Sequence, residues 1–286
     1  MTEKKDLWSS EAYQNSASFV PKLATKIVQW LDPQKDDIIL DIGCGDGILN
    51  IQISEILAQG SGSIHGTDSS PAMIAAAQQA AANSTNSSSA SKCTFEVADA
   101  LKLAQFPHLQ SGHFTKLFSN AALHWVLGAA KSAPAAQTGF FAAARAALAP
   151  GGIFAFEMGG LGNVAEIRSA LLSAVARYAP GGLPTAVAAD PWFFPDEAWV
   201  TKVMEEEVGG WKVERAEREY RPTVADEGGV EGWVRLFGAP FFEAVPEEQR
   251  EKCVKEAVDV LEVVCRNPNG GFHLGYVRLR VLAKKL

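Results

Sequence analysis

Three acidic residues lie at or near the ends of three predicted strands in the first hundred residues. Asp41 is near the end of the largely apolar run 37–42, Asp68 ends the short run 63–68, and Asp99 follows the run 94–98. The carboxyl ends of parallel strands meet at one edge of an open sheet, where nucleotide ligands bind. Carboxylates at that edge attract a cation or accept hydrogen bonds from a ribose. The spacing therefore predicts a nucleotide-type site.

The first of these strands runs into a glycine-rich turn and then into a helix. Gly43, Gly45 and Gly47 alternate with Cys44 and Asp46. Glycines allow a sharp turn and leave bare amides at a helix N-terminus. The third glycine comes one residue too early for the dinucleotide fingerprint GxGxxG, and the turn lacks the lysine and Ser/Thr of a P-loop. We expect Cys44 to be a small turn residue rather than a catalytic thiol.

Two cofactors compete for this site, a nicotinamide dinucleotide and S-adenosylmethionine. S-adenosylmethionine is positively charged at its sulfonium and amino group and has no phosphate. Asp41 would hold the ammonium or order water around it, Asp68 would accept both ribose hydroxyls, and Asp99 with the amide of Ala100 would meet the adenine. Asp68 alone does not discriminate, because nicotinamide sites hold the ribose in the same way. Three carboxylates together favour the cationic cofactor.

The three acidic residues can meet only if an alternation of strands and helices positions them. Apolar spacing predicts helices over 7–31 and 48–57, from 71 onward and over 138–148, and strands over 37–42, 63–68, 94–98, 115–119 and 153–157. This alternation implies parallel strands joined by crossover helices. The Ser- and Asn-rich stretch 83–92 predicts a flexible surface loop.

The pattern changes after residue 160. It predicts helices over 164–178 and 196–207, an aromatic segment at 191–195, a strand over 211–220, a mostly helical stretch over 226–266 and a last strand over 275–283. Apolar residues of the last strand alternate with Arg278 and Arg280. Such alternation predicts a half-exposed strand with its arginines on a solvated face.

Three motifs carry a resemblance to a known family. The run 66–74 (GTDSSPAMI), with DIGCG at 41–45 before it and SNAALHW at 119–125 after it, resembles class I S-adenosylmethionine-dependent methyltransferases. Within that class the chain is most similar to the trans-aconitate methyltransferase group of small-molecule carboxyl O-methyltransferases, and the malonyl-carrier-protein methyltransferases are close relatives. The match is strongest over residues 36–158.

The resemblance implies an α/β fold, with a seven-stranded, mostly parallel Rossmann-like sheet, helices on both faces and a helical cap. Strand seven would be inserted antiparallel beside strand five. Residues 1–35 would form an N-terminal helical lid and residues 36–160 the S-adenosylmethionine-binding core. Residues 161–286 would add the cap insertions and the C-terminal antiparallel strands of the same sheet.

The resemblance also assigns site residues. Those expected at the cofactor are Tyr13, Gln14, Asp41, Gly43, Cys44, Gly45, Asp68, Ser69, Met73, Asp99, Ala100 and Asn120. Those expected at the substrate are Trp8, His124, Trp125, Trp192 and Trp233. His124 is the one catalytic candidate, as a general base toward a hydroxyl or amine. The segment 192–194 is either a substrate lid or internal packing of the cap.

The expected reaction is carboxyl O-methylation of an organic acid by in-line methyl transfer. A carboxylate is already ionised at neutral pH, so it needs no base. A polycarboxylate acceptor would need arginines that converge on the pocket, and Arg145, Arg221 and Arg235 are candidates. The alternatives are methylation of a hydroxyl or amine of a secondary metabolite, a cofactor-binding homologue without turnover, and a nicotinamide-linked oxidoreductase.

Composition limits the partners. The 286 residues include 26 basic and 33 acidic ones, a net charge of −7, which argues against a nucleic-acid partner. The four cysteines form no CxxC pair, so no metal site is expected. No signal peptide or long apolar run is evident, which predicts a cytoplasmic protein without a membrane partner. The oligomeric state is left open.

Overall fold

The computed structural model describes residues 24–84 and 86–286 and places seven strands in one sheet. Their order is β3-β2-β1-β4-β5-β7-β6. The strands are β1 (Ile38–Ile42), β2 (Ser63–Asp68), β3 (Cys93–Val97), β4 (Phe114–Asn120), β5 (Leu148–Gly159), β6 (Trp211–Val224) and β7 (His273–Lys285). Neighbours among β1 to β5 are parallel, and β7 is antiparallel to both β5 and β6. The predicted sheet is confirmed, with its inserted antiparallel strand.

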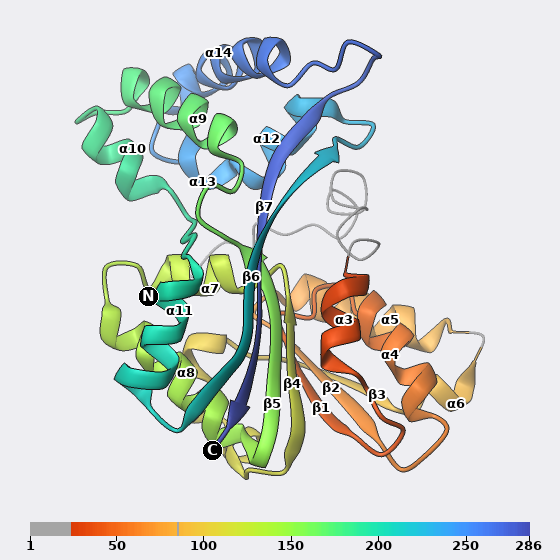
Figure 1. Cartoon of the computed structure of the whole chain (residues 1–286). Coiled ribbons are helices and arrows are strands. Elements are labelled where there is room, and N and C mark those ends of the chain that lie inside the picture. Colours follow the sequence, from red (N-terminus) through yellow and green to blue (C-terminus); the bar gives the residue numbers. More distant parts are fainter. Residues whose placement is uncertain (1–23, 85) are drawn as a thin grey trace.

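Helices cover both faces of the sheet (Figure 1). On one side lie α3 (Thr25–Leu31), α4 (Ile48–Leu57), α5 (Pro71–Ala82) and α6 (Ser87–Ala90). On the other side lie α7 (Leu123–Ala129), α8 (Pro134–Ala147) and α11 (Glu197–Thr201), and the 3₁₀ helices η1 (Ala100–Gln105) and η2 (Pro107–Gln110) follow β3. Short α6 lies within the stretch predicted to be a loop. Asn86 accounts for it, because its side-chain oxygen accepts the amide of Ser89 and caps the turn (3.3 Å).

Above the sheet in Figure 1 stands a second layer, the helical cap. It consists of α9 (Ala165–Tyr178), α10 (Leu183–Ala189), α12 (Gly229–Phe237), α13 (Ala239–Phe242) and α14 (Glu247–Val264). The cap has its own apolar core, which includes Leu171, Trp192, Trp233 and Phe241 and reaches Tyr276 of β7. The division into lid, core and cap stays a prediction, and most of the expected lid lies outside the described residues.

Two predicted elements differ from the structure at their ends. The predicted helix 196–207 divides into α11 and a π-helix, η3 (Lys202–Val208). Glu205 of η3 accepts a hydrogen bond from the amide of Val213 in β6 (2.8 Å) and so ties the widened turns to the sheet. Strand β5 begins five residues before the predicted strand, because Leu148 pairs with Phe114 across a bulge.

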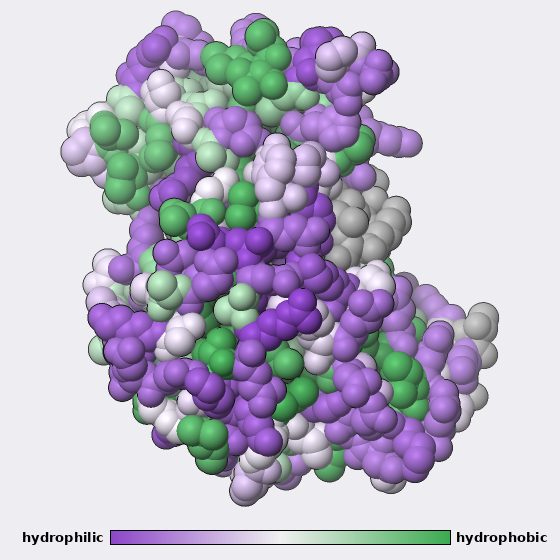
Figure 2. All heavy atoms as spheres, viewed as in Figure 1, coloured by the Kyte–Doolittle hydropathy of each residue, from purple (hydrophilic) through white to green (hydrophobic). Residues whose placement is uncertain are grey.

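The last strand was predicted wrongly as half-exposed. Arg278 is 4% exposed and Arg280 1%. The reason is the position of β7, which lies between β5 and β6 and so has a neighbour on each side. Strand β6 is the edge of the sheet instead, and Figure 2 shows a largely hydrophilic surface there. Among residues 24–84 and 86–286, no helix has the combination of length and apolar character that crossing a membrane requires.

Candidate functional site

The glycine turn after β1 is held against the end of β2. The amides of Gly43 and Cys44 both donate to the carbonyl of Thr67, at 2.7 and 3.0 Å. Gly43 has a φ of +76°, and a Cβ there would lie 2.2 Å from the Cβ of Ala122. Gly45 has a φ of +57°, but a Cβ there would meet no atom of residues 24–84 or 86–286 within 4 Å. The turn therefore packs tightly at Gly43 and leaves open space beside Gly45.

Asp68 organises this turn from the end of β2. Its Oδ2 accepts the amide of Gly45 (3.1 Å) and its Oδ1 accepts the amide of Ser70 (2.9 Å). Ser70 in turn caps α5 by accepting the amide of Met73 (3.2 Å). A carboxylate has about four lone-pair sites, more than these two backbone amides occupy. The predicted ribose acceptor thus stands beside the open space at Gly45.

Two buried oxygens at the edge of the sheet lack partners. Asp41 is 2% exposed, and its Oδ1 makes no hydrogen bond with any residue in 24–84 or 86–286. The same is true of Oδ1 of Asn120, at the end of β4. Burial and the negative charge of Asp68 raise the pKa of Asp41 to about 8. Buried acceptors without donors are costly. A ligand with a cationic amine and hydrogen-bond donors fits these residues.

Asp41 makes stability depend on pH. A carboxyl group with a raised pKa keeps its proton in the folded chain after the unfolded chain has lost it, so the free energy of unfolding falls as pH rises from about 4 to about 8. Asp41→Asn removes this fall. We expect the free energy of unfolding of the variant, relative to the unaltered protein, to rise by about 1–3 kcal/mol between pH 5 and pH 8. Chemical denaturation at both pH values measures it.

The matched control for this experiment is Glu55→Gln, which changes an exposed carboxyl group on α4. The free energy of unfolding of this variant should depend on pH as it does in the unaltered protein. If the free energies of unfolding of Asp41→Asn and the unaltered protein differ by the same amount at both pH values, the raised pKa is contradicted.

The loop after β4 is strained beside the site. Ala121 has a φ of +59°, an unusual conformation for a residue with a Cβ. Its amide donates to the carbonyl of Glu157 in β5 (2.8 Å), which holds it there. Such strain often accompanies functional loops. Ala121 also separates Asn120 from Ala122, the residue against which Gly43 packs.

The remaining candidates for cofactor contact differ in their exposure and in their hydrogen-bond partners. Asp99 caps η1 by accepting the amide of Leu101 (3.1 Å) and pairs with Lys102 (3.3 Å), and Ala100 is the first residue of η1. Met73 is 3% exposed, whereas Ser69 is exposed. Contacts of these residues with a cofactor stay predictions. Trp8, Tyr13 and Gln14 lie outside the described residues.

Cys44 has the surroundings of an inert thiol. Burial and the negative charges of Asp41 and Asp68 raise its pKa well above the ordinary value. A thiol with a raised pKa is a poor nucleophile at neutral pH. The prediction that Cys44 is only a small residue of the turn has this support.

His124 lies in α7 among aromatic rings. It is 8% exposed, and its ring centre lies 5.6 Å from that of Trp125 and 5.8 Å from that of Phe194. Its Nδ1 accepts the amide of Gly159 at 3.4 Å, so the proton of the neutral ring lies on Nε2. Burial and the positive charge of Arg278 hold the pKa of His124 well below its ordinary value. This arrangement favours a hydrogen-bond donor over the predicted general base.

Two of the four tryptophans predicted at the substrate, Trp192 and Trp233, lie inside the cap. Trp192 is 3% exposed and Trp233 4%, and their ring centres are 5.9 Å apart. Trp233 donates from Nε1 to the hydroxyl of Tyr276 (2.7 Å). Trp192 also lies 5.7 Å from Trp125, which is only partly buried. Their burial supports internal packing of the cap for Trp192, and substrate contact stays a prediction for all three tryptophans.

A buried charge cluster was missed by the sequence analysis. Glu157 of β5 is 1% exposed, and its Oε1 accepts from Arg278 Nε (2.9 Å) and Arg221 Nη2 (3.2 Å). Its Oε2 accepts from Arg280 Nε (2.5 Å). Burial alone raises the pKa of Glu157, but the three arginines outweigh it and leave the pKa below its ordinary value. One sequence signal existed, because Glu157 is a charged residue in an otherwise apolar strand.

Arg278 uses only part of its guanidinium in this cluster. Only its Nε is hydrogen-bonded, and its two terminal nitrogens make no hydrogen bond with the described part of the chain. Arg278 pairs with Gly159 of β5, whose amide donates to Nδ1 of His124, so Arg278 lies at the same end of the sheet as α7. The sequence analysis offered three arginines for a polycarboxylate acceptor, and of these only Arg221 belongs to this cluster. Arg145 bonds to backbone carbonyls near the end of η3, and Arg235 pairs with Glu231 and Glu251 on the cap.

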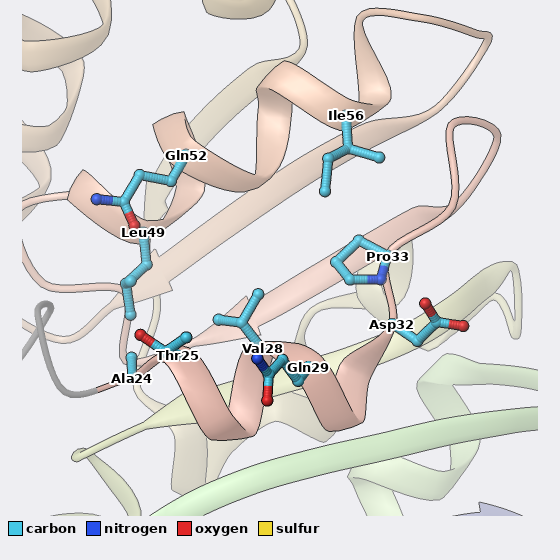
Figure 3. A pocket seen from close by; sticks show the side chains of 9 residues that line it. All are labelled: Ala24, Thr25, Val28, Gln29, Asp32, Pro33, Leu49, Gln52 and Ile56. Carbon is cyan, nitrogen blue, oxygen red and sulfur yellow. The ribbon is translucent and has the colours of Figure 1, made fainter.

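A separate cleft of about 420 Å³ lies between α3 and α4 (Figure 3). Val28 and Gln29 line it from α3, and Leu49, Gln52 and Ile56 from α4. None of the predicted site residues that the structure describes lines this cleft.

Comparison with known proteins identifies the family. A model described as a methyltransferase domain matches residues 39–152. An uncharacterised methyltransferase of Schizosaccharomyces pombe, C70.08c, is 34% identical over 284 residues, which cover 98% of this chain and 99% of the relative. The chain therefore belongs to the class I, S-adenosylmethionine-dependent methyltransferases. The predicted family, enzyme class and methyl donor are confirmed at this level.

Solved structures share the fold at low identity. A putative methyltransferase from Bacillus halodurans has a TM-score of 0.54 and 12% identity, over 92% of this chain and 99% of its own. A phosphoethanolamine N-methyltransferase from Haemonchus contortus, solved with phosphomonomethylethanolamine and S-adenosylhomocysteine, has a TM-score of 0.53 and 13% identity, over 96% of this chain and 56% of its own. These likenesses confirm the sheet architecture and leave the methyl acceptor undecided.

Proposed function

We propose that this methyltransferase transfers a methyl group to the carboxylate of a small organic acid. S-adenosylmethionine supplies a methyl group activated by a sulfonium. The chain would hold that donor at the ends of β1, β2 and β3 and would place the acceptor carboxylate beside the ends of β4 and β5. The acceptor assignment rests on Arg278, a buried guanidinium whose terminal nitrogens make no hydrogen bond with the described residues. Arg278 pairs with Gly159 in the sheet, and the amide of Gly159 donates to His124 of α7.

The donor side of the proposal rests on charge and on unused acceptors. Asp41 and Asn120 each have a buried oxygen without a described partner, which suits the ammonium and main chain of the methionine part. Asp68 would accept the ribose hydroxyls beside the open space at Gly45, and Asp99 would meet the adenine. Close approach of the reacting atoms, at about 3–3.5 Å, would then do most of the catalytic work.

The acceptor side rests on arginine chemistry. Guanidinium groups bind carboxylates through paired N–H donors, and burial strengthens the attraction. A carboxylate nucleophile needs no general base. That agrees with His124, whose Nδ1 is already hydrogen-bonded and whose pKa is low. Membership of the trans-aconitate methyltransferase group is part of the same proposal.

The reaction is tested by methyl transfer from labelled S-adenosylmethionine across small di- and tricarboxylic acids, fatty acids and terpenoid acids. We expect turnover with at least one acid and a product that releases methanol in mild alkali, as methyl esters do. Turnover confined to amines or alcohols, with an alkali-stable product, would contradict carboxyl methylation. Donor binding without turnover on any acceptor would favour a non-catalytic homologue.

Asp68→Ala tests the ribose assignment. The loss of hydrogen bonds to a charged group should weaken S-adenosylmethionine binding by about 1.5–3 kcal/mol, or roughly 10- to 150-fold. Isothermal titration calorimetry measures the dissociation constant. Asp68→Asn is the control, because it removes the charge and keeps one side-chain oxygen, which can still accept one of the two backbone amides that Asp68 holds. An unchanged dissociation constant in Asp68→Ala would refute the assignment.

A further inference from the structure

Three potential metal ligands meet on the opposite half of the sheet from the arginine cluster. His65 lies in β2, Glu96 in β3 and His108 in η2. Their ligand atoms all lie within 4.8 Å of one another. Parallel pairing sets His65 opposite Thr94, and Thr67 opposite Glu96. Side chains alternate along a strand, so His65, Thr94 and Glu96 share one face of the sheet.

Both imidazoles lie within hydrogen-bond distance of the same carboxylate oxygen. Nε2 of His65 lies 3.0 Å from Oε1 of Glu96, and Nε2 of His108 lies 2.8 Å from it. The hydroxyl of Thr94 lies 2.7 Å from Nδ1 of His65 and orients that ring. Two ring nitrogens on one oxygen require either a proton on each nitrogen or a cation among the three groups.

We propose that His65, Glu96 and His108 bind a divalent transition metal, with zinc as the best fit. Two imidazoles and one carboxylate are an established donor set for zinc, with water in the fourth position. Bonds of about 2.0–2.2 Å place ligand atoms slightly more than 3 Å apart, so the three groups need only small movements. Thr94 supplies the outer hydrogen bond that metal-bound histidines commonly make.

The site is separate from the proposed methyl transfer, and its role would be structural. Strand β3 is an edge strand, and His108 lies beyond η1, the helix that begins directly after Asp99. A metal ion at this point would join β2, β3 and η2. It would thereby anchor both ends of the segment that carries Asp99 and Ala100. The sequence analysis expected no metal because it weighed cysteine pairs, and the two histidines are too far apart in the chain to form a recognised motif.

The test uses the full-length protein, freed of metal with a chelator and then titrated with zinc chloride. We expect one zinc ion per chain by calorimetry and a higher melting temperature, because a metal that binds only the folded state stabilises it. Cobalt(II) should give the visible absorption of a tetrahedral site. His108→Gln, which changes an exposed residue, should weaken zinc binding at least about 100-fold, and so should Glu96→Gln.

His113→Ala is the matched control. His113 is exposed and lies in the loop before β4, and among the described residues its side chain hydrogen-bonds only to Ser111. It should bind zinc as the unaltered protein does. The proposal is overturned if the protein takes up no stoichiometric zinc, if His108→Gln and Glu96→Gln bind zinc normally, or if His113→Ala loses zinc equally. S-adenosylmethionine binding is measured on the same samples, so a failure here is distinguishable from a failure of the proposed function.

Discussion

Replacing Glu157 with glutamine is expected to lower the free energy of unfolding by about 3–5 kcal/mol, the usual cost of removing one partner from a buried ion pair. Glu157 is the carboxylate shared by Arg221, Arg278 and Arg280, and both Arg278 and Arg280 are almost fully buried. Glutamine keeps the shape and loses the charge, so these guanidiniums would repel one another in a medium that screens poorly. Urea denaturation at neutral pH measures the loss.

The matched control for Glu157 is Glu251→Gln. Glu251 also pairs with an arginine, Arg235, but its side chain is 78% exposed. Exposed pairs contribute about 1 kcal/mol or less, so this variant should be nearly as stable as the unaltered protein. Equal losses in the two variants would contradict a special role of the buried cluster.

The effect of Glu157 also has a pH signature. The pKa of Glu157 in the folded chain is lowered from the ordinary 4.5. Its contribution to the free energy of unfolding is therefore fully present above pH 4.5. The contribution is lost as pH falls through the folded pKa. The stability difference between Glu157→Gln and the unaltered protein should therefore be constant from pH 6 to pH 8 and shrink in acid.

Arg278→Gln is expected to raise the KM for the acid acceptor about 100-fold and to leave the dissociation constant of S-adenosylmethionine unchanged. Truncating one partner of a buried, hydrogen-bonded charge pair costs about 2–5 kcal/mol, and a 100-fold change corresponds to about 2.7 kcal/mol. Steady-state kinetics with the acid found in the acceptor screen, together with calorimetry of the donor, separates the two effects.

Arg278→Gln should lower the free energy of unfolding less than Glu157→Gln does. Arg221 and Arg280 remain on the carboxylate of Glu157, so no uncompensated negative charge is left. Arg235→Gln, on the cap surface, is the control and should change neither constant. If KM is unaffected while stability falls, Arg278 is only a structural partner of Glu157 and the acceptor proposal loses its main support.

Local signals in the sequence predicted the residues of the proposed donor half of the site. Asp41, the turn glycines and Asp68 lie within thirty residues of one another, and hydrogen bonds of adjacent strands and turns bring them together. Their positions follow from strand ends, positive-φ glycines and helix caps, which depend on near neighbours in the chain. The same local logic predicted strands β1 to β5.

The acceptor half could not be predicted in this way. Arg278 follows Glu157 by more than a hundred residues, and its burial depends on β7 lying between β5 and β6. Alternating arginines look alike in an exposed edge strand and in an inner strand with a buried carboxylate opposite. The sequence by itself determined the class of fold, and it supplied the carboxylates of the proposed donor site. Only the tertiary structure decided which arginines are buried and which histidines meet, because both depend on pairing between distant segments.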